Sequence, residues 1–296
     1  MSKRANELPV STRQDGCGRA VAALCVLALA AAVPAGARGE SAEWCDSQWE
    51  VATSDPGEGL LPAYETLLAR WRQYAGKCAG TVVFEARLAF LYALNDEPEK
   101  AREALKSVPA AASPYQHLVD VASLQTEMAE IFKSRASDKQ ARLERLEAKY
   151  AALVARYPEW PQGYILLGGL QTSLDHHPEA IKTLIAGLNH IPKDKRLAPN
   201  LWSLYRHLAV SYAESGDYRN ALRAADIAYE LNKGVTSDPQ LMFSAAKAYA
   251  GTGDFESARK TLALIALKEP RVKNDPRFLG AQEFVNSRMA ETPARR

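Results

Sequence analysis

One pattern recurs along this chain: an apolar helix that ends in a small residue and tyrosine, a short polar turn, and a second helix that opens around alanine. Four segments align on that alanine, which is Ala101, Ala180, Ala221 or Ala258. The last three alanines are 41 and 37 residues apart, and the first two are 79 apart, which leaves room for one degenerate hairpin at about residues 114–157. Because one hairpin cannot bury its apolar face alone, the repeat predicts a stack of helical hairpins.

The repeated positions hold residue types that close helix packing needs. Alanine or glycine stands at the points where the two helices of a hairpin cross, and small side chains permit a short interaxial distance. Gly216 and Gly253 suit the positive φ that ends the first helix of a pair. Pro98 and Pro178 stand where second helices are expected to start, since a missing N–H costs little at that position. Pro192 and Pro270 stand where second helices are expected to stop.

These residues resemble the tetratricopeptide repeat (TPR) family, in an exported bacterial form, over about residues 80–270. The last two segments carry a small residue, Tyr212 or Tyr249, a Gly-Asp-aromatic turn and then alanine. In the second segment Gln171 and Asp175 replace the expected aromatic residue and turn glycine. The resemblance implies an all-α, right-handed superhelical α-solenoid of about five hairpins with N- and C-terminal capping helices.

In this family the concave face is lined by the first helix of each hairpin, and the resemblance therefore implies a binding groove there. Phe243 is the expected anchor for a partner, because exposed aromatic side chains dominate interface energetics. The alternative is that Ile165 and Phe243 pack against the neighbouring hairpin. The lysine and asparagine set with which some members clamp a C-terminal carboxylate is absent, since Val210 stands where an amide is needed. The positions expected to be exposed are Gln162, Ile165, Gly169, Thr172, Arg206, Val210, Ala213, Gln240, Phe243 and Lys247.

The first 37 residues have the layout of a secretory signal peptide. Four basic residues precede an uncharged run over residues 20–33, and Ala35-Gly36-Ala37 forms a cleavage site. The run is shorter than the roughly 20 residues that span a bilayer, so cleavage after Ala37 is favoured over an uncleaved inner-membrane anchor. We therefore expect a periplasmic or secreted protein.

Cys45 and Cys78 are the two cysteines beyond this leader, and an even number in an exported protein predicts a disulfide rather than a metal site. Residues 38–79 are expected to form an N-terminal cap that the disulfide ties down, with the Trp44–Trp49 region covering the first hairpin rather than forming an aromatic ligand platform. A closing helix is expected at about residues 275–290, within a C-terminal segment of residues 271–296.

Charge and motifs favour a binding protein over an enzyme. Without the four cations and two anions of residues 1–37, 33 of each remain, so no net field steers the mature chain to nucleic acid. Asp175-His176-His177 lacks a third ligand at metal-binding spacing, and no catalytic or phosphate-binding motif occurs. The predicted function is a non-catalytic scaffold in the cell envelope that binds a protein or peptide and needs no cofactor. The alternative is an enzyme or enzyme accessory acting on cell-wall or exported polymers.

Overall fold

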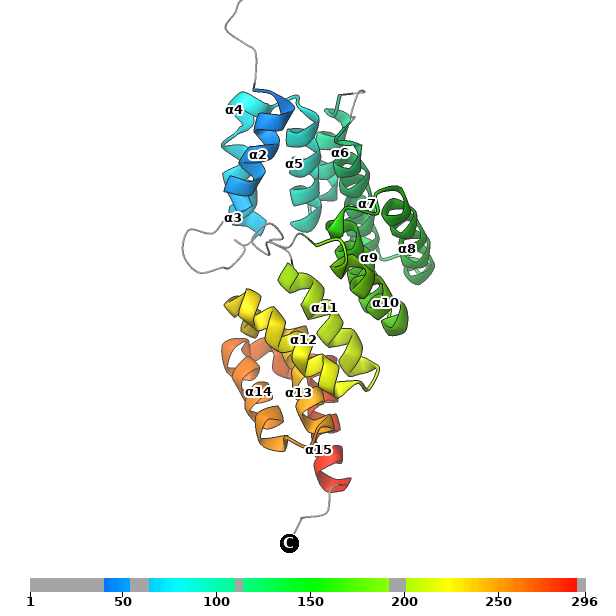
Figure 1. The fold of residues 1–296 in the computed structure, drawn as a ribbon, viewed down its shortest axis with the longest axis vertical. Coiled ribbons are helices and arrows are strands. Elements are labelled where there is room, and N and C mark those ends of the chain that lie inside the picture. Colours follow the sequence, from blue (N-terminus) through cyan, green and yellow to red (C-terminus); the bar gives the residue numbers. More distant parts are fainter. Residues whose placement is uncertain (1–39, 54–63, 110–113, 192–200, 292–296) are drawn as a thin grey trace, which may run out of the picture. The chain divides into compact units, whose positions relative to one another are not determined.

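A computed structural model describes residues 40–53, 64–109, 114–191 and 201–291, and every regular element among them is a helix (Figure 1). Three helices come first: α2 (Ala42–Thr53), α3 (Tyr64–Arg72) and α4 (Ala75–Cys78). Five hairpins follow: α5 (Val82–Leu94) with α6 (Pro98–Lys106), α7 (Gln116–Lys133) with α8 (Lys139–Arg156), α9 (Pro161–Ser173) with α10 (His177–Leu188), α11 (Leu201–Glu214) with α12 (Tyr218–Leu231), and α13 (Pro239–Gly251) with α14 (Phe255–Lys268). The last helix is α15 (Pro276–Glu291), and two short 3-10 helices, η2 (Lys233–Ser237) and η3 (Pro270–Asn274), precede α13 and α15.

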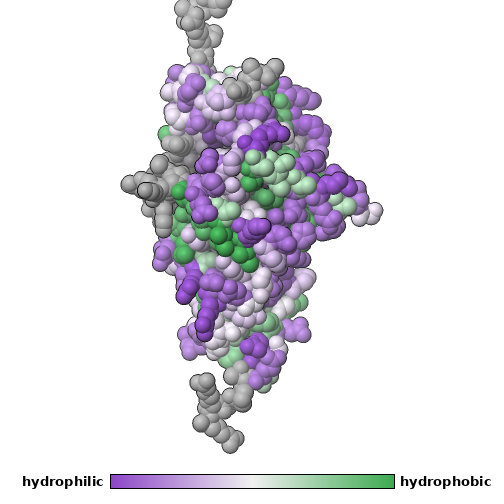
Figure 2. Space-filling view, turned by 45° about the vertical axis from the view of Figure 1, so that its right-hand side comes forward, coloured by the Kyte–Doolittle hydropathy of each residue, from purple (hydrophilic) through white to green (hydrophobic). Residues whose placement is uncertain are grey.

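The predicted fold class, an all-α array of about five hairpins, is confirmed. Within the array most first helices pack on the next first helix: α5 on α7, α9 on α11, α11 on α13, and α13 on α15. The exception is α7 and α9, which scarcely approach each other, and α9 packs instead against α8. The face drawn in Figure 2 is mostly hydrophilic, with hydrophobic residues gathered in separate patches.

The turn inside four of the hairpins has the same backbone geometry. Asp96, Asp175, Gly216 and Gly253 have φ values of 58°, 60°, 80° and 89°. In each turn the amide that follows this residue donates to the carbonyl five residues earlier, at 2.9 Å. The positive φ expected at the two glycines is therefore found, and aspartate takes the same left-handed conformation in the first and third hairpins, as its short polar side chain permits.

The small residues at the crossing points are buried between paired helices. Gly168 is the tightest case: a Cβ atom added there would lie 2.5 Å from Cγ and Cδ2 of Leu184, which is itself fully buried. Helix α9 can approach α10 this closely only because residue 168 has no side chain. The alanines on which the four segments align are also almost fully buried: Ala101, Ala180, Ala221 and Ala258.

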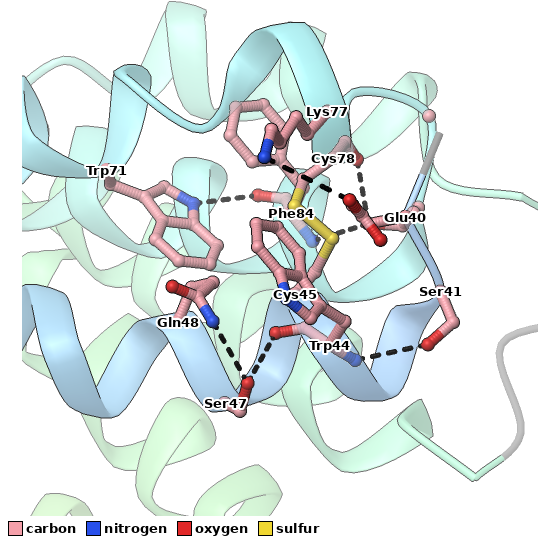
Figure 3. The surroundings of a disulfide bond; sticks show 12 residues. Glu40, Ser41, Trp44, Cys45, Ser47, Gln48, Trp71, Lys77, Cys78 and Phe84 are labelled. Atoms are coloured by element: carbon pink, nitrogen blue, oxygen red, sulfur yellow. Dashed lines mark hydrogen bonds and ion pairs between the residues drawn. A yellow bond between two sulfur atoms is a disulfide. The ribbon is translucent and has the colours of Figure 1, made fainter. Parts of the chain in front are cut away.

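A disulfide joins two of the N-terminal helices to each other, and an aromatic cluster packs them against the first hairpin (Figure 3). Cys45 of α2 and Cys78 of α4 are bonded, with their Cα atoms 5.9 Å apart. Trp71 is fully buried, stacks on Phe84 at 5.5 Å between ring centroids, and donates its indole N–H to the Phe84 carbonyl at 3.2 Å. Trp49 meets Trp71 edge to face at 5.2 Å. The predicted disulfide is present, and the tryptophan-rich α2 covers α5.

Some expectations fall outside the described residues, among them the leader of residues 1–37 and the helix stop at Pro192. Pro98 begins α6 as its first residue, whereas Pro178 is the second residue of α10. Pro270 follows the last turn of α14. No helix in the described part of the chain is both long enough and apolar enough to cross a bilayer.

We expect Gly168→Ala to lower the free energy of unfolding by about 1–3 kcal/mol, because the added methyl group must displace a buried leucine. Gly280→Ala is the matched control, since nothing lies within 4 Å of the position of its Cβ in α15. That control should raise the free energy of unfolding by about 0.5–1 kcal/mol through helix propensity. Urea denaturation followed by circular dichroism measures both, and equal effects at the two sites would contradict the close crossing.

Removing the disulfide by Cys45→Ala with Cys78→Ala should cost about 3–4 kcal/mol of stability, because the bond closes a loop over a sequence separation of 33. Urea denaturation of the oxidised, reduced and double-alanine proteins measures this, and the last two should agree. Alkylation and mass spectrometry of protein purified from its native cells provide the control. Two free thiols in that material would show that the bond does not form.

Candidate functional site

A cavity of about 290 Å³ opens among the first helices of the first four hairpins. Its walls come from α5, α7, α9 and α11, with further residues from α2 and α3, and we call it the first-helix cavity. The backbones of α7 and α9 approach each other little beside it, although buried side chains of both helices share one hydrophobic core with α8. The lining residues are Trp49, Thr53, Leu67, Phe90, Leu91, Leu94, Gln125, Met128, Phe132, Gln162, Ile165, Leu166, Gly169, Leu170, Ser173, Trp202, Ser203 and His207.

The walls of the first-helix cavity are apolar and aromatic, interrupted by a few uncharged polar groups. No aspartate, glutamate, lysine or arginine is among the described residues that line it. The polar groups are amides and hydroxyls, such as those of Gln125, Gln162 and Ser203. A charged ligand would lose its hydration here without gaining an opposite charge, so the cavity favours an uncharged ligand.

One polar atom in the wall lacks a hydrogen-bond partner among the described residues. The indole Nε1–H of Trp202, near the start of α11, is buried and unpaired. An indole nitrogen can only donate, and buried polar groups are rarely left unsatisfied in native proteins. Its acceptor would have to come from outside the described residues.

His207, one and a half turns further along α11, contributes a neutral ring to the wall. Desolvation, and secondarily the neighbouring Arg206 guanidinium, lower its pKa from 6.5 to about 3. The ring lies close against α9: a Cβ atom added to Gly169 would be 2.9 Å from His207 Nε2. Residue 169 therefore has to be small for the imidazole to fit, and the imidazole carries no charge at neutral pH.

Three of the residues expected in a groove do line this cavity: Gln162, Ile165 and Gly169. The expected exposure is nevertheless wrong for several positions, which are buried in the stack. Ile165 is 6% exposed and Phe243 is 3% exposed. Phe243 packs edge to face against Phe278 of α15, at 5.7 Å between ring centroids. Phe243 is therefore a core residue between α13 and the closing helix α15. This agrees with the alternative interpretation, in which Phe243 packs inside the array and does not bind a partner.

Thr172, Val210 and Ala213 are likewise buried, at 2%, 2% and 4% exposure. The Thr172 hydroxyl lies 3.0 Å from the Ser211 hydroxyl of the next first helix and donates to the Gly168 carbonyl at 2.8 Å. The physical reason is the packing of first helices on one another, which covers the faces that these positions occupy.

The charged and amide residues expected in the groove join one hairpin to the next. Arg206 donates from Nε to Asp238 at 2.5 Å and from Nη2 to Gln240 at 3.0 Å, which links α11 to α13. Lys247 of α13 pairs with Glu214 of α11 at 2.8 Å. Arg206, Gln240 and Lys247 do not line the first-helix cavity.

The sequence interpretation missed the residues that give the cavity its chemistry, above all Trp202 and His207. On α9 the residues that face the cavity include Leu166, Gly169 and Ser173, whereas Thr172 does not line it. The cavity face is therefore shifted by about one residue around the helix from the predicted face. A signal was present: Ser203 and His207 stand 41 residues after Gln162 and Leu166, the spacing of the repeat.

The histidine pair lies at the start of α10: His176 is the residue before the helix and His177 is its first residue. His176 Nδ1 is 2.9 Å from Glu147 of α8, and the Gln171 amide donates to the same carboxylate at 3.0 Å. His177 Nε2 is 3.6 Å from Asp175. Across the described ranges, no three His, Cys, Asp or Glu side chains are grouped so as to hold a metal ion.

Because His207 is neutral when folded but titrates near pH 6.5 when unfolded, the unfolded state binds more protons below pH 6.5. Stability should therefore fall on acidification from about pH 6.5 to 3, by up to about 1.4 kcal/mol per pH unit from this group. Urea denaturation across this range should show a shallower pH dependence for His207→Gln than for the wild type. Parallel curves would mean that the ring is accessible to water.

No protein-family profile and no curated protein matches this chain. Among solved structures, one described as MamA MSR-1 C2 is 16% identical, covering 69% of this chain and 97% of its own, with a TM-score of 0.40. A thermophilic TPR protein of Thermus thermophilus is 19% identical, covering 70% of this chain and 97% of its own, with a TM-score of 0.42. The fold assignment rests on the hairpin contacts and the four equivalent turns rather than on these overlaps. On those grounds the described residues have the architecture of an α-helical array of stacked hairpins.

Proposed function

We propose that this protein is a non-catalytic, protein-binding scaffold that holds a peptide or protein segment in the first-helix cavity. The observation that carries the proposal is the uncharged, aromatic wall with a buried indole N–H that lacks an acceptor among the described residues. Apolar pockets with a few directed polar groups are the usual form of binding sites.

The cavity chemistry defines the bound segment. Its side chains at the site are apolar and uncharged, and one of its carbonyl groups accepts from Trp202 Nε1. A volume of about 290 Å³ is small for a whole ligand, since drug-sized sites occupy roughly 300–1,000 Å³. The cavity therefore receives a few anchoring side chains of a longer segment rather than a complete folded partner.

We also propose that the scaffold works in the bacterial cell envelope, in the periplasm or after secretion. Two features support this: the signal-like residues 1–37, and a disulfide, which persists in oxidising compartments. Retention of residues 20–33 as an inner-membrane anchor, with the array facing the periplasm, is the alternative. Sequencing the N-terminus of native protein by mass spectrometry distinguishes the two: Arg38 comes first after cleavage.

A photo-crosslinking amino acid tests the cavity in the native envelope. Placed at Ser173, which lines the cavity and is exposed, it should form defined adducts with one or a few proteins. Placed at Lys182, exposed on second helix α10, it should not form the same adducts.

Leu166→Glu sharpens this test, because it puts a charge into the uncharged wall. We expect at least about a tenfold loss of the Ser173 adducts, since an unpaired charge is costly to desolvate. Leu264→Glu, on an exposed leucine of α14 outside the cavity, is the control and should leave the adducts unchanged. Circular dichroism verifies that both variants stay helical. Adducts that survive Leu166→Glu would exclude the cavity as the binding site.

A further inference from the structure

A second apolar hollow lies at the other end of the described array, between α14 and α15. It has a volume of about 870 Å³, and its described lining residues come from α14, η3 and α15. We call it the end crevice. It forms because α15 packs mainly on α13 and less closely on α14. It shares no residue with the first-helix cavity.

The end crevice exposes large apolar side chains to water. Leu267 is 79% exposed and Leu279 is 50% exposed, and both line the crevice. Contiguous exposed apolar residues of this kind are typical of interaction sites.

The shape of the crevice suits a helix. From α15, the lining stripe Phe278, Gln282, Val285 and Met289 follows helical spacing over 11 residues, which corresponds to about 16 Å of helix. The facing stripe of α14 runs from Arg259 through Leu262 and Ala266. These two mainly apolar stripes, about three turns long on α15 and about two on α14, form the kind of groove into which an amphipathic helix packs.

Charge identifies the chemistry of the occupant. Arg259 and Lys273 are the charged residues in the lining, both exposed, and neither has an ion-pair partner among the described residues. No carboxylate lines the crevice on the described chain. A partner with acidic side chains beside its apolar stripe would pair with both cations, whereas a basic one would be repelled.

We propose that the end crevice binds an amphipathic helical segment of another protein, whose apolar stripe is flanked by glutamate or aspartate. A second copy of this chain fits less well, because a two-fold interface on this surface would bring Arg259 and Lys273 toward the same cations. The proposal is independent of what occupies the first-helix cavity.

A pair of designed peptides tests the proposal with the processed protein, residues 38–296. One is a fluorescein-labelled three-turn helix with leucine at i, i+4, i+7 and i+11 and glutamate beside them, and the other has lysine for every glutamate. Fluorescence anisotropy at low salt should show that the glutamate peptide binds about tenfold or more tightly than the lysine peptide.

Charge reversal at the crevice should reverse this preference. Arg259→Glu with Lys273→Glu should favour the lysine peptide, whereas Arg219→Glu with Arg223→Glu, an equal charge change on exposed positions of α12, should keep the original order. Leu267→Gln should lower the binding affinity for both peptides about tenfold. Leu264→Gln, on the same helix but outside the lining, should leave both affinities unchanged.

Three outcomes would overturn the proposal. The first is an absence of saturable binding by either peptide. The second is equal affinity for both, unaffected by reversal of Arg259 and Lys273. The third is a dimer in sedimentation equilibrium that Leu267→Gln abolishes, because the crevice would then be covered by a second copy. Leu166→Glu in the first-helix cavity should leave peptide binding unchanged, which separates failure of this proposal from failure of the proposed function.

Discussion

The close crossing of paired helices is the constraint on which the rest of this structure depends. Gly168 lies so near Leu184 that no other side chain fits, and buried alanines occupy the matching points of the other hairpins. Close packing at such short distances adds dispersion contacts and buries apolar surface, and this stabilises two helices that would be only marginally stable alone. In four of the five hairpins a left-handed residue in the turn reverses the chain with the same backbone geometry, whereas the turn of the second hairpin lacks such a residue.

The irregular second hairpin interrupts this regular stacking and so creates the cavity. Helices α7 and α8 are 18 residues each, longer than the helices of the other hairpins. Gln171, at the position where the other hairpins with the same turn have tyrosine, reaches across to Glu147 of α8, which also holds His176. Helix α9 therefore packs more closely on α8 than on α7, and residues of both α7 and α9 line the cavity.

The two hollows of the array differ in chemistry in a way that suits different ligands. The first-helix cavity has no charged residue in its described lining and keeps His207 neutral, so the proposed ligand would be selected by apolar contact and one hydrogen bond. The end crevice adds two cations to a longer apolar surface and so selects by charge as well. A scaffold with two such sites could hold two partners at once, provided that each contributes a short anchoring segment.

The amino-acid sequence by itself determined the helical class, the number of hairpins, the turn conformations at Gly216 and Gly253 and the cysteine pair, because these follow from spacing, side-chain size and local backbone preference. It also placed the lining of a site on the first helices. Only the tertiary structure decided which side of those helices meets solvent. Thr172, Val210 and Phe243 are buried because the next first helix or α15 covers them, while Trp202 and His207 face the cavity because α7 and α9 stand apart. The buried face and the cavity face of such a helix differ by about one residue position around the helix axis. Packing between helices, whose residues are far apart in the chain, decides which face is buried.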